Sequence, residues 1–187
     1  VEVVKKSLQK EINYLTIKKV KINDGNLRYK VQKQDFDKIL GFKIIQIKRR
    51  SKYLLFFFNN NFVMIIHLGM TGKFFIEKKN VLKKTSFYYD IKNEDNKHHR
   101  LIFNFNNKIN LIYNDVRKFG FLKIISLNKI KINKHLKILG PEPMSNFFNF
   151  KYVKNYLIGR NRTTKDLLMD QKFVSGLGNI YVNEILF

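Results

Sequence analysis

Four short segments of the sequence combine residue types that could carry out chemistry, and the first places a lysine at the start of an apolar run. Arg49, Arg50 and Lys52 lead directly into residues 54–58, which lack polar alternation and are therefore expected to be buried on both faces. Half-apolar surroundings lower the pKa of a lysine and make it a usable proton carrier. Lys52 is thus a candidate acid–base residue. The alternative is a solvated basic cluster at the start of a strand.

The second segment places a methionine between two glycines directly after an apolar run. Residues 67–72 read His-Leu-Gly-Met-Thr-Gly, so Met70 is expected at the tip of a loop. An apolar side chain on a loop of a basic protein could wedge between stacked bases. The alternative is that Met70 folds back and fills a gap in the core.

The third segment, residues 113–120, places two cations and an aromatic ring between a strand and a glycine. Arg117 could fork onto a base edge or a phosphate, and Phe119 could fill the space left by an extruded nucleotide. The alternative is a hairpin tip with ordinary packing.

The fourth segment, residues 165–187, contains a glycine-rich turn between two helical patterns. The turn Ser-Gly-Leu-Gly at residues 175–178 opens a helix at Asn179, and free backbone N–H groups at such a start can hold a phosphate. The alternative is that the glycines serve only the geometry of a helix–turn–helix connection.

A minor basic segment, residues 97–100, precedes a predicted strand. We expect no metal site there, because the sequence has four histidines and no cysteine and ligand partners are scarce. The lack of cysteine also excludes a disulfide framework, a thiolate zinc site and a cysteine nucleophile within these residues.

The composition indicates a folded protein with an anionic partner. Among 187 residues, 37 are Lys or Arg and 14 are Asp or Glu, which gives a formal net charge of +23. Such an excess points to nucleic acid or an anionic membrane surface, although a compositional drift toward Lys, Asn and Ile could supply part of it. Hydrophobic residues make up 44% of the chain, which excludes intrinsic disorder. No apolar run is long enough to span a bilayer, and no signal peptide is visible.

All of these segments except residues 165–187 must be positioned by short strands in the first two thirds of the chain. Val1, Val4, Leu8 and Ile12 recur at helical spacing, so the chain opens with an amphipathic helix. Between residues 14 and 125 short apolar runs alternate with turn signals, which predicts an antiparallel β-sandwich or barrel.

The last third of the chain is predicted to be helical. The segment Gly-Pro-Glu-Pro at residues 140–143 is a rigid extended break. Beyond it, helices are expected over residues 150–157, over residues 164–169 and from about Gly178 onward. The predicted class is α+β, with a sandwich domain over residues 1–127, a linker over 128–147 and an all-α domain over 148–187.

Taken together and in order, the segments resemble the formamidopyrimidine-DNA glycosylase family of bacterial base-excision repair enzymes. The HLGM and LGPEP forms fit its oxidised-purine branch better than the endonuclease VIII branch. The matching stretches are RRSKYLLF (49–56), HLGMTGKF (67–74), KHHR (97–100), YNDVRKFG (113–120), LGPEP (139–143) and LMDQKFVSGLGNIYVNEILF (168–187).

The resemblance implies a bifunctional glycosylase and AP lyase that removes 8-oxoguanine and formamidopyrimidines from damaged double-stranded DNA. In such enzymes an N-terminal proline amine attacks the sugar and forms a Schiff base. Lys52 matches the proton donor of β-elimination. The residues that match those filling the helix after base flipping are Met70, Arg117 and Phe119, and those that match DNA-holding positions are His98, Arg117, Arg160, Lys165 and Asn179, the last in a helix–two-turn–helix motif.

Several departures from the family pattern qualify these expectations. Val116, Lys118 and Arg100 stand where a proline, an arginine and a histidine are usual, so a phosphate contact at Arg100 is expected in altered form. The sequence begins after the expected proline and glutamate, and both ends suggest a segment of a longer protein. We therefore expect these 187 residues to bind DNA weakly without catalysis, and the one structural zinc of the family to lie in a C-terminal part outside them.

Two other hypotheses stay open beside the repair enzyme. One is a catalytically inactive DNA-binding relic of the same fold. The other is a generic basic RNA-associated protein, which explains the charge but not the ordered segments. The family resemblance further implies a cytoplasmic, nucleoid-associated monomer that needs no membrane.

Overall fold

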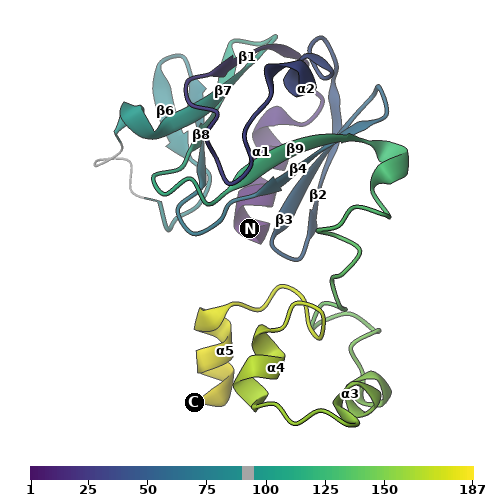
Figure 1. Cartoon of the computed structure of the whole chain (residues 1–187). Helices are drawn as coiled ribbons and strands as arrows, with labels where there is room; N and C mark the ends of the chain where they lie inside the picture. Colours follow the sequence, from purple (N-terminus) through teal and green to yellow (C-terminus); the bar gives the residue numbers. More distant parts are fainter. Residues whose placement is uncertain (90–94) are drawn as a thin grey trace. The chain divides into compact units, whose positions relative to one another are not determined.

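The computed structural model describes residues 1–89 and 95–187, and these form two compact units (Figure 1). The first unit comprises residues 1–49 and 53–130, and the second comprises residues 50–52 and 131–187. An N-terminal helix, two antiparallel sheets and a helical last third confirm the predicted α+β class.

The first unit opens with helix α1 (Glu2–Ile12), as the spacing of its apolar residues predicts. Val4, Leu8 and Ile12 are buried on one face of the helix and belong to the core of the unit, whereas Val1 is 37% exposed. Burial of this apolar stripe, more than helix propensity, stabilises an 11-residue helix.

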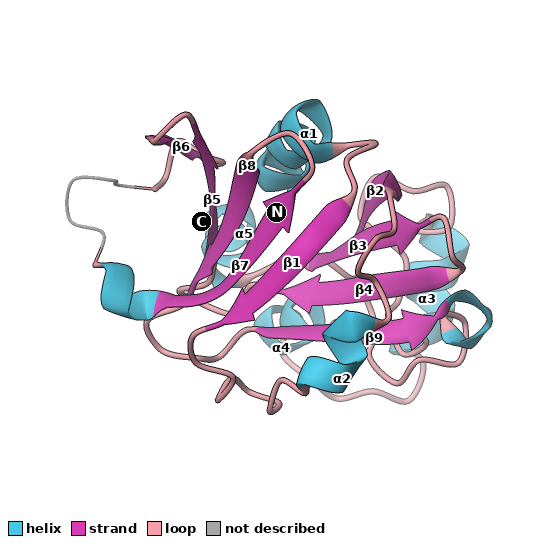
Figure 2. Cartoon of the chain, turned by 90° about the horizontal axis from the view of Figure 1, so that it is seen from above, coloured by secondary structure: helices cyan, strands magenta, loops and turns pink. Residues whose placement is uncertain are grey.

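Among the residues that the structure describes, nine strands build the two sheets of the first unit, and every pairing described between them is antiparallel (Figure 2). The five-stranded sheet has the order β1-β7-β8-β5-β6, and the four-stranded sheet has the order β2-β3-β4-β9. The strands are β1 (Ile17–Ile22), β2 (Ile44–Arg50), β3 (Tyr53–Phe58), β4 (Phe62–His67), β5 (Lys73–Lys78), β6 (Val81–Lys84), β7 (His99–Phe105), β8 (Ile109–Asn114) and β9 (Phe121–Ser126). Short helices are α2 (Lys33–Asp37), η1 (Asn96–His98) and η2 (Leu127–Lys129).

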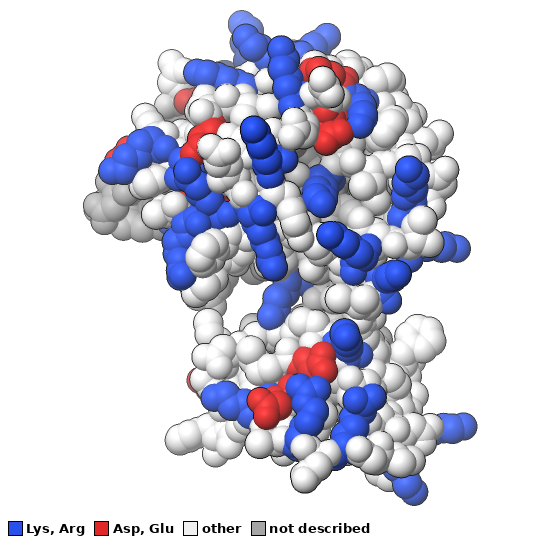
Figure 3. All heavy atoms as spheres, viewed as in Figure 1, with Lys and Arg blue, Asp and Glu red and all other residues white. Residues whose placement is uncertain are grey.

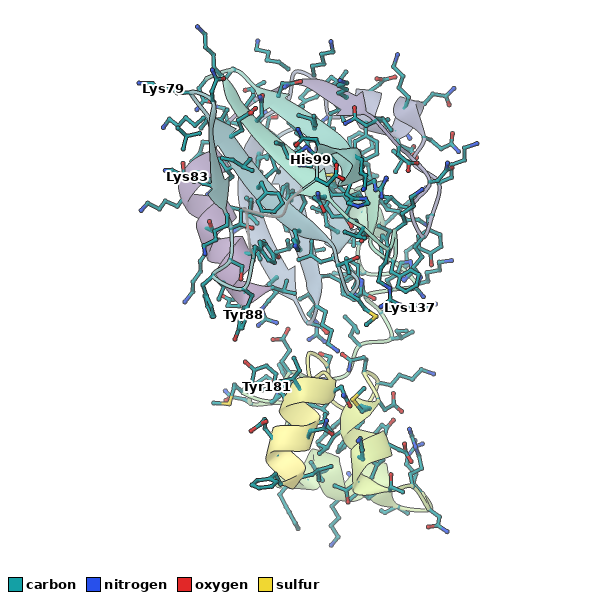
Figure 4. The ribbon with its side chains drawn as sticks, turned by 90° about the vertical axis from the view of Figure 1, so that its left-hand side faces the viewer. Lys79, Lys83, Tyr88, His99, Lys137 and Tyr181 are labelled. Carbon is teal, nitrogen blue, oxygen red and sulfur yellow. The ribbon has the colours of Figure 1, made fainter. Side chains whose placement is uncertain are left out.

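The core of the first unit is formed by apolar residues from both sheets. The ring centroid of Phe56 on β3 lies 6.4 Å from that of Phe74 on β5, and Phe74 in turn lies 5.3 Å from Tyr113 on β8. Leu54, Leu55, Phe56 and Phe58 are buried, so β3 carries buried side chains on both faces as expected, although Phe57 is only half-buried. Charged residues lie outside this core: Lys79 and Lys83 of the β5–β6 hairpin extend away from the sheet (Figure 4).

The second unit contains three helices whose bounds agree with the sequence pattern. They are α3 (Phe150–Leu157), α4 (Thr164–Met169) and α5 (Asn179–Leu186). Asn149 caps α3 and Thr163 caps α4, because each side chain accepts a hydrogen bond from a backbone N–H in the first turn. Leu167, Phe173 and Val174 form a small core, against which Tyr152 and Tyr156 of α3 pack.

Replacing Phe56 with alanine tests the position of the main core. Phe56 is fully buried, so Phe56→Ala is expected to lower the free energy of unfolding by about 3–5 kcal/mol, measured by urea denaturation followed by circular dichroism. The control is Phe87→Ala, which removes an exposed ring and is expected to change stability by about 0.5 kcal/mol or less. Equal losses in the two variants would contradict the core described above.

Candidate nucleic-acid interface

Three of the predicted site residues meet at the tips of two neighbouring loops in the first unit. Met70 lies in the turn between β4 and β5, and Arg117 and Phe119 lie in the loop between β8 and β9. The Arg117 guanidinium lies 4.5 Å from the centre of the Phe119 ring, and its Nη1 lies 3.3 Å from Met70 Sδ. The structure thus brings an apolar side chain, a cation and an aromatic ring into one cluster.

All three side chains face solvent. Met70 is 73% exposed and Phe119 is 46% exposed, and Arg117 is also exposed. The alternative in which Met70 folds back into the core is therefore wrong. Exposed methionine and phenylalanine beside a cation leave an apolar surface that a stacked base could contact.

Glycine is required where the two loops approach each other. Gly69 has a φ of +65°, and a Cβ placed on it would lie 2.7 Å from the backbone carbon of Phe119. A Cβ on Gly120 would collide with the Tyr113 hydroxyl group. Any side chain at these two positions would prevent the close approach of the two loops, so glycine is needed at both.

The carboxylate of Asp115 holds the two loops together. It is completely buried, and it accepts hydrogen bonds from Thr71 Oγ1 at 2.6 Å, from the Gly120 backbone N–H at 2.9 Å and from the Tyr113 hydroxyl at 3.1 Å. Thr71 Oγ1 also accepts a hydrogen bond from the backbone N–H of Arg117 at 3.0 Å. The Asp115 network thus fixes the backbone on both sides of Arg117 and Phe119.

Tyr113 donates to Asp115 because it keeps its proton. Burial and the neighbouring negative charge of Asp115 raise the pKa of the Tyr113 hydroxyl well above its usual value. Its O–H therefore stays available as a donor at neutral and mildly alkaline pH. Asp115 and Tyr113 lie within residues 113–120, but their role could not be read from residue types.

Arg100 is a structural residue, and the phosphate contact expected of it does not fit the structure. It is only 6% exposed, and its nitrogens donate to the backbone oxygen of Asp115 at 2.8 Å and to Asp24 Oδ2 at 3.0 Å. It also contacts His98, with 3.2 Å between Arg100 Nη2 and His98 Nδ1. Arg100 therefore connects the predicted DNA-contact residue His98 to the loop that carries Arg117.

Asp24 balances part of this positive charge. Its carboxylate binds Lys118 Nζ at 2.7 Å as well as Arg100. The hydrogen bond from Lys118 and the one from the Asn26 backbone lower the pKa of Asp24, so it stays ionised. Lys118, at a position with a φ of +60°, is thus held by Asp24 at the base of the loop.

The other predicted DNA-contact residues lie in the second unit, one after α3 and the others at the starts of α4 and α5. Arg160 follows α3 and stacks on Tyr156, with 4.1 Å from the guanidinium carbon to the ring centre. Lys165 lies in the first turn of α4, and Asn179 is the first residue of α5. All three are exposed, and Lys165 and Asn179 lie where helix N–H groups lack partners within the helix.

Lys52 belongs to the second unit, where it is about half-buried next to Gly178. A Cβ added at Gly178 would lie 3.2 Å from Lys52 Nζ. Desolvation by burial lowers the pKa of the Lys52 ammonium below its usual value, which is the direction predicted from the sequence. Its neighbours Arg50 and Ser51 are hydrogen-bonded within the same unit, so the segment is not a solvated cluster.

Neither a metal cluster nor a membrane span is found in the part of the chain that the structure describes. Within residues 1–89 and 95–187, no three histidines or carboxylates lie close enough together to hold a metal ion. Among the same residues, no helix has the length and apolar character needed to cross a bilayer.

The chain combines a β-sandwich that carries these loop tips with a helical unit, and both parts match domains of one protein family. Residues 1–122 match the family model of the formamidopyrimidine-DNA glycosylase N-terminal domain, and residues 139–187 match that of the formamidopyrimidine-DNA glycosylase H2TH domain. The chain therefore belongs to the formamidopyrimidine-DNA glycosylase family.

Individual relatives agree with this assignment over the whole chain. It is 40% identical over 187 residues to formamidopyrimidine-DNA glycosylase of Rickettsia bellii (strain OSU 85-389) and 35% identical over 188 residues to that of Rhodopseudomonas palustris (strain CGA009). It covers 63% and 64% of those two proteins, so it spans just under two thirds of their length.

Solved structures of one family member share the fold. A complex of Lactococcus lactis Fpg with DNA containing an abasic site superposes with a TM-score of 0.84 at 32% identity, covering 99% of this chain and 64% of that one. A complex of the same protein with DNA containing N7-benzyl-Fapy-dG gives the same score, identity and coverage.

Substituting Asp115 tests whether the buried carboxylate holds the loops. Asp115→Asn removes the charge and replaces one accepting oxygen by an N–H donor, so at least one of the three hydrogen bonds to the carboxylate is lost or must be reversed. We expect a loss of about 1–3 kcal/mol in unfolding free energy and faster amide exchange at Arg117 and Gly120.

The matched control is Asp35→Asn on α2. The Asp35 carboxylate is exposed and pairs with Lys38 at 2.6 Å, so its loss is expected to cost about 0.5 kcal/mol or less. If Asp115→Asn were as mild as this control, and the exchange at Gly120 unchanged, the network would not be what orders the loops.

Proposed function

We propose that this chain is the β-sandwich and helical part of a DNA glycosylase that removes damaged bases in base-excision repair. The observation that carries the proposal is the cluster of Met70, Arg117 and Phe119 on ordered, exposed loop tips in a member of this family. An extruded nucleotide leaves a gap one base deep in the duplex. Two apolar side chains fill such a gap, and an arginine between them can hydrogen-bond the base left unpaired.

The positive charge of the chain supports a polyanionic partner. Lys and Arg are spread over the face shown in Figure 3, with few Asp or Glu among them. Damaged double-stranded DNA is the partner we propose, with His98, Arg160, Lys165 and Asn179 on phosphates. Each phosphate contact would add about −0.9 to the slope of log affinity against log salt concentration.

The chemistry we propose is combined base removal and strand cleavage on oxidised purines. The resemblance implies that an N-terminal proline amine displaces the damaged base from the sugar and forms a Schiff base, and that β-elimination then breaks the strand. Lys52 would donate the proton in that elimination, because burial lowers its pKa and makes its ammonium group a stronger acid than an ordinary lysine. The zinc and the monomeric state that the resemblance implies stay predictions.

A DNA-binding protein without catalysis is the second candidate. The observation that favours it is the use of Arg100 and Lys118, which stand at drifted positions, for internal contacts to Asp24. Such a relic would keep the loop tips and the affinity for DNA and would lack the Schiff-base chemistry.

Borohydride trapping on a duplex with 8-oxoguanine opposite cytosine separates the two candidates. The product of the complete gene should give a covalent protein–DNA band, because borohydride reduces a Schiff base to a stable amine. Replacement of a leading proline should abolish the band. Salt-sensitive binding without any band would support the relic and contradict the enzyme.

Met70→Ala tests the gap-filling role of the loop tip. With less apolar surface to replace the extruded base, the variant should extrude the base less often. The fluorescence increase of 2-aminopurine placed beside the lesion should then be about tenfold smaller, which corresponds to ~1.4 kcal/mol of lost binding to the opened duplex. Met144→Ala is the control, because Met144 is 97% exposed and lies outside the loop cluster. An equal fluorescence change in the two variants would argue against the wedge.

A further inference from the structure

The turn that carries Lys52 is fastened by the guanidinium of Arg50. Arg50 Nη2 donates to the backbone oxygens of Gly140 at 2.7 Å and Leu139 at 3.1 Å, and Nη1 donates to Ser175 Oγ at 2.9 Å. Nη1 also pairs with Glu142 Oε1 at 3.2 Å. One planar group thus joins the segment at residues 139–142 to the loop before α5, and all of these residues belong to the second unit.

The Glu142 side chain holds the same turn through a hydrogen bond to the backbone of the turn. Its Oε1 accepts a hydrogen bond of 2.7 Å from the backbone N–H of Ser51, and Ser51 has a φ of +55°. A left-handed conformation costs a residue other than glycine about 1–2 kcal/mol, so a charge-assisted hydrogen bond at that point offsets the strain. Ser51 is itself buried.

Gln171 completes the enclosure on the side of the glycine-rich loop. Its Oε1 accepts from the Gly176 backbone N–H at 2.9 Å and its Nε2 donates to the Leu177 oxygen at 2.8 Å. Ser51 Oγ lies 3.4 Å from Gln171 Oε1. The loop is thereby shaped so that the Lys52 ammonium group lies where a side chain on Gly178 would be, with 3.2 Å between its Nζ and a Cβ added there.

The hydrogen bonds of Arg50, Glu142 and Gln171 determine the surroundings of Lys52. Its half-buried stem follows directly after the fastened Ser51, and its ammonium group lies beside Gly178 at the start of α5. The desolvation that lowers its pKa therefore depends on the turn staying closed. An open turn would hydrate the ammonium group.

We propose that Arg50 and Glu142 are positioning residues that hold Lys52 in place for proton transfer. This inference rests on the proposed function, in which Lys52 moves the proton of β-elimination. Neither residue needs to contact the substrate in this role. Arg50→Lys should remove the role although it keeps the charge, because one ammonium group cannot reach two carbonyls, a hydroxyl and a carboxylate in the plane that a guanidinium spans.

The first measurement is the pKa of Lys52 in the 187-residue chain, by NMR of ¹³C-dimethylated lysines with the signal assigned in Lys52→Arg. The Lys52 pKa should lie below that of the other lysines, and Arg50→Lys should raise it toward the ordinary value. The control is Arg162→Lys, because Arg162 pairs with Asp170 at 2.7 Å in the same unit and should leave the Lys52 pKa unchanged.

The second measurement is strand cleavage by the complete gene product on a duplex with an abasic site. Arg50→Lys should lower kcat about tenfold or more with little change in KM, and should move the alkaline limb of its pH profile upward. Glu142→Gln should act in the same direction, and it replaces Arg50→Lys if that variant does not fold.

The outcomes separate this inference from the function on which it rests. A folded Arg50→Lys variant with an unchanged Lys52 pKa and unchanged kcat would overturn the positioning role. A pKa that rises as expected, in a protein whose wild type never cleaves the abasic strand, would support the frame around Lys52 and remove the proposed elimination step.

Discussion

The geometry of the loop cluster depends on one buried negative charge. A carboxylate removed from water costs several kcal/mol unless donors surround it, so Asp115 is stable only while Thr71, Tyr113 and Gly120 all direct a proton toward it. Those donors come from separate segments, and each must hold its backbone in place to satisfy the charge. The backbone that carries the exposed residues Met70 and Arg117 is thus held by buried hydrogen bonds, which leave the two side chains uncovered.

The second unit uses a positive charge in the same way. Arg50 is satisfied mainly by backbone oxygens and Glu142, and Gly140 is needed there because any Cβ at that position would collide with the Lys172 oxygen. In both units a charged group organises irregular backbone next to the residues proposed to act on DNA. Irregular segments have few ladder hydrogen bonds, so a multivalent charged group is an efficient way to give them a single conformation.

Local patterns in the sequence predicted the elements well, and distant pairings were beyond them. Apolar spacing predicted α3 and α4 at their observed bounds, because this signal lies within the helices themselves; the caps at Asn149 and Thr163 became visible only in the structure. The flanking glycines likewise predicted the exposed loop at Met70. The burial of Arg100 could not be predicted, because its partner Asp24 lies 76 residues away and a lysine-rich sequence makes every cation look like a surface residue.

The pairing of β1 with β7 has a consequence for how the chain becomes folded. Ile17 lies opposite Phe105, so a strand near the start of the chain finds its neighbour only after more than a hundred residues have been made. The last strand of the other sheet, β9, ends at Ser126. During synthesis both sheets therefore stay incomplete until those strands leave the ribosome. Contacts so distant along the chain make folding slow, which exposes the nascent protein to aggregation and gives chaperones time to bind it.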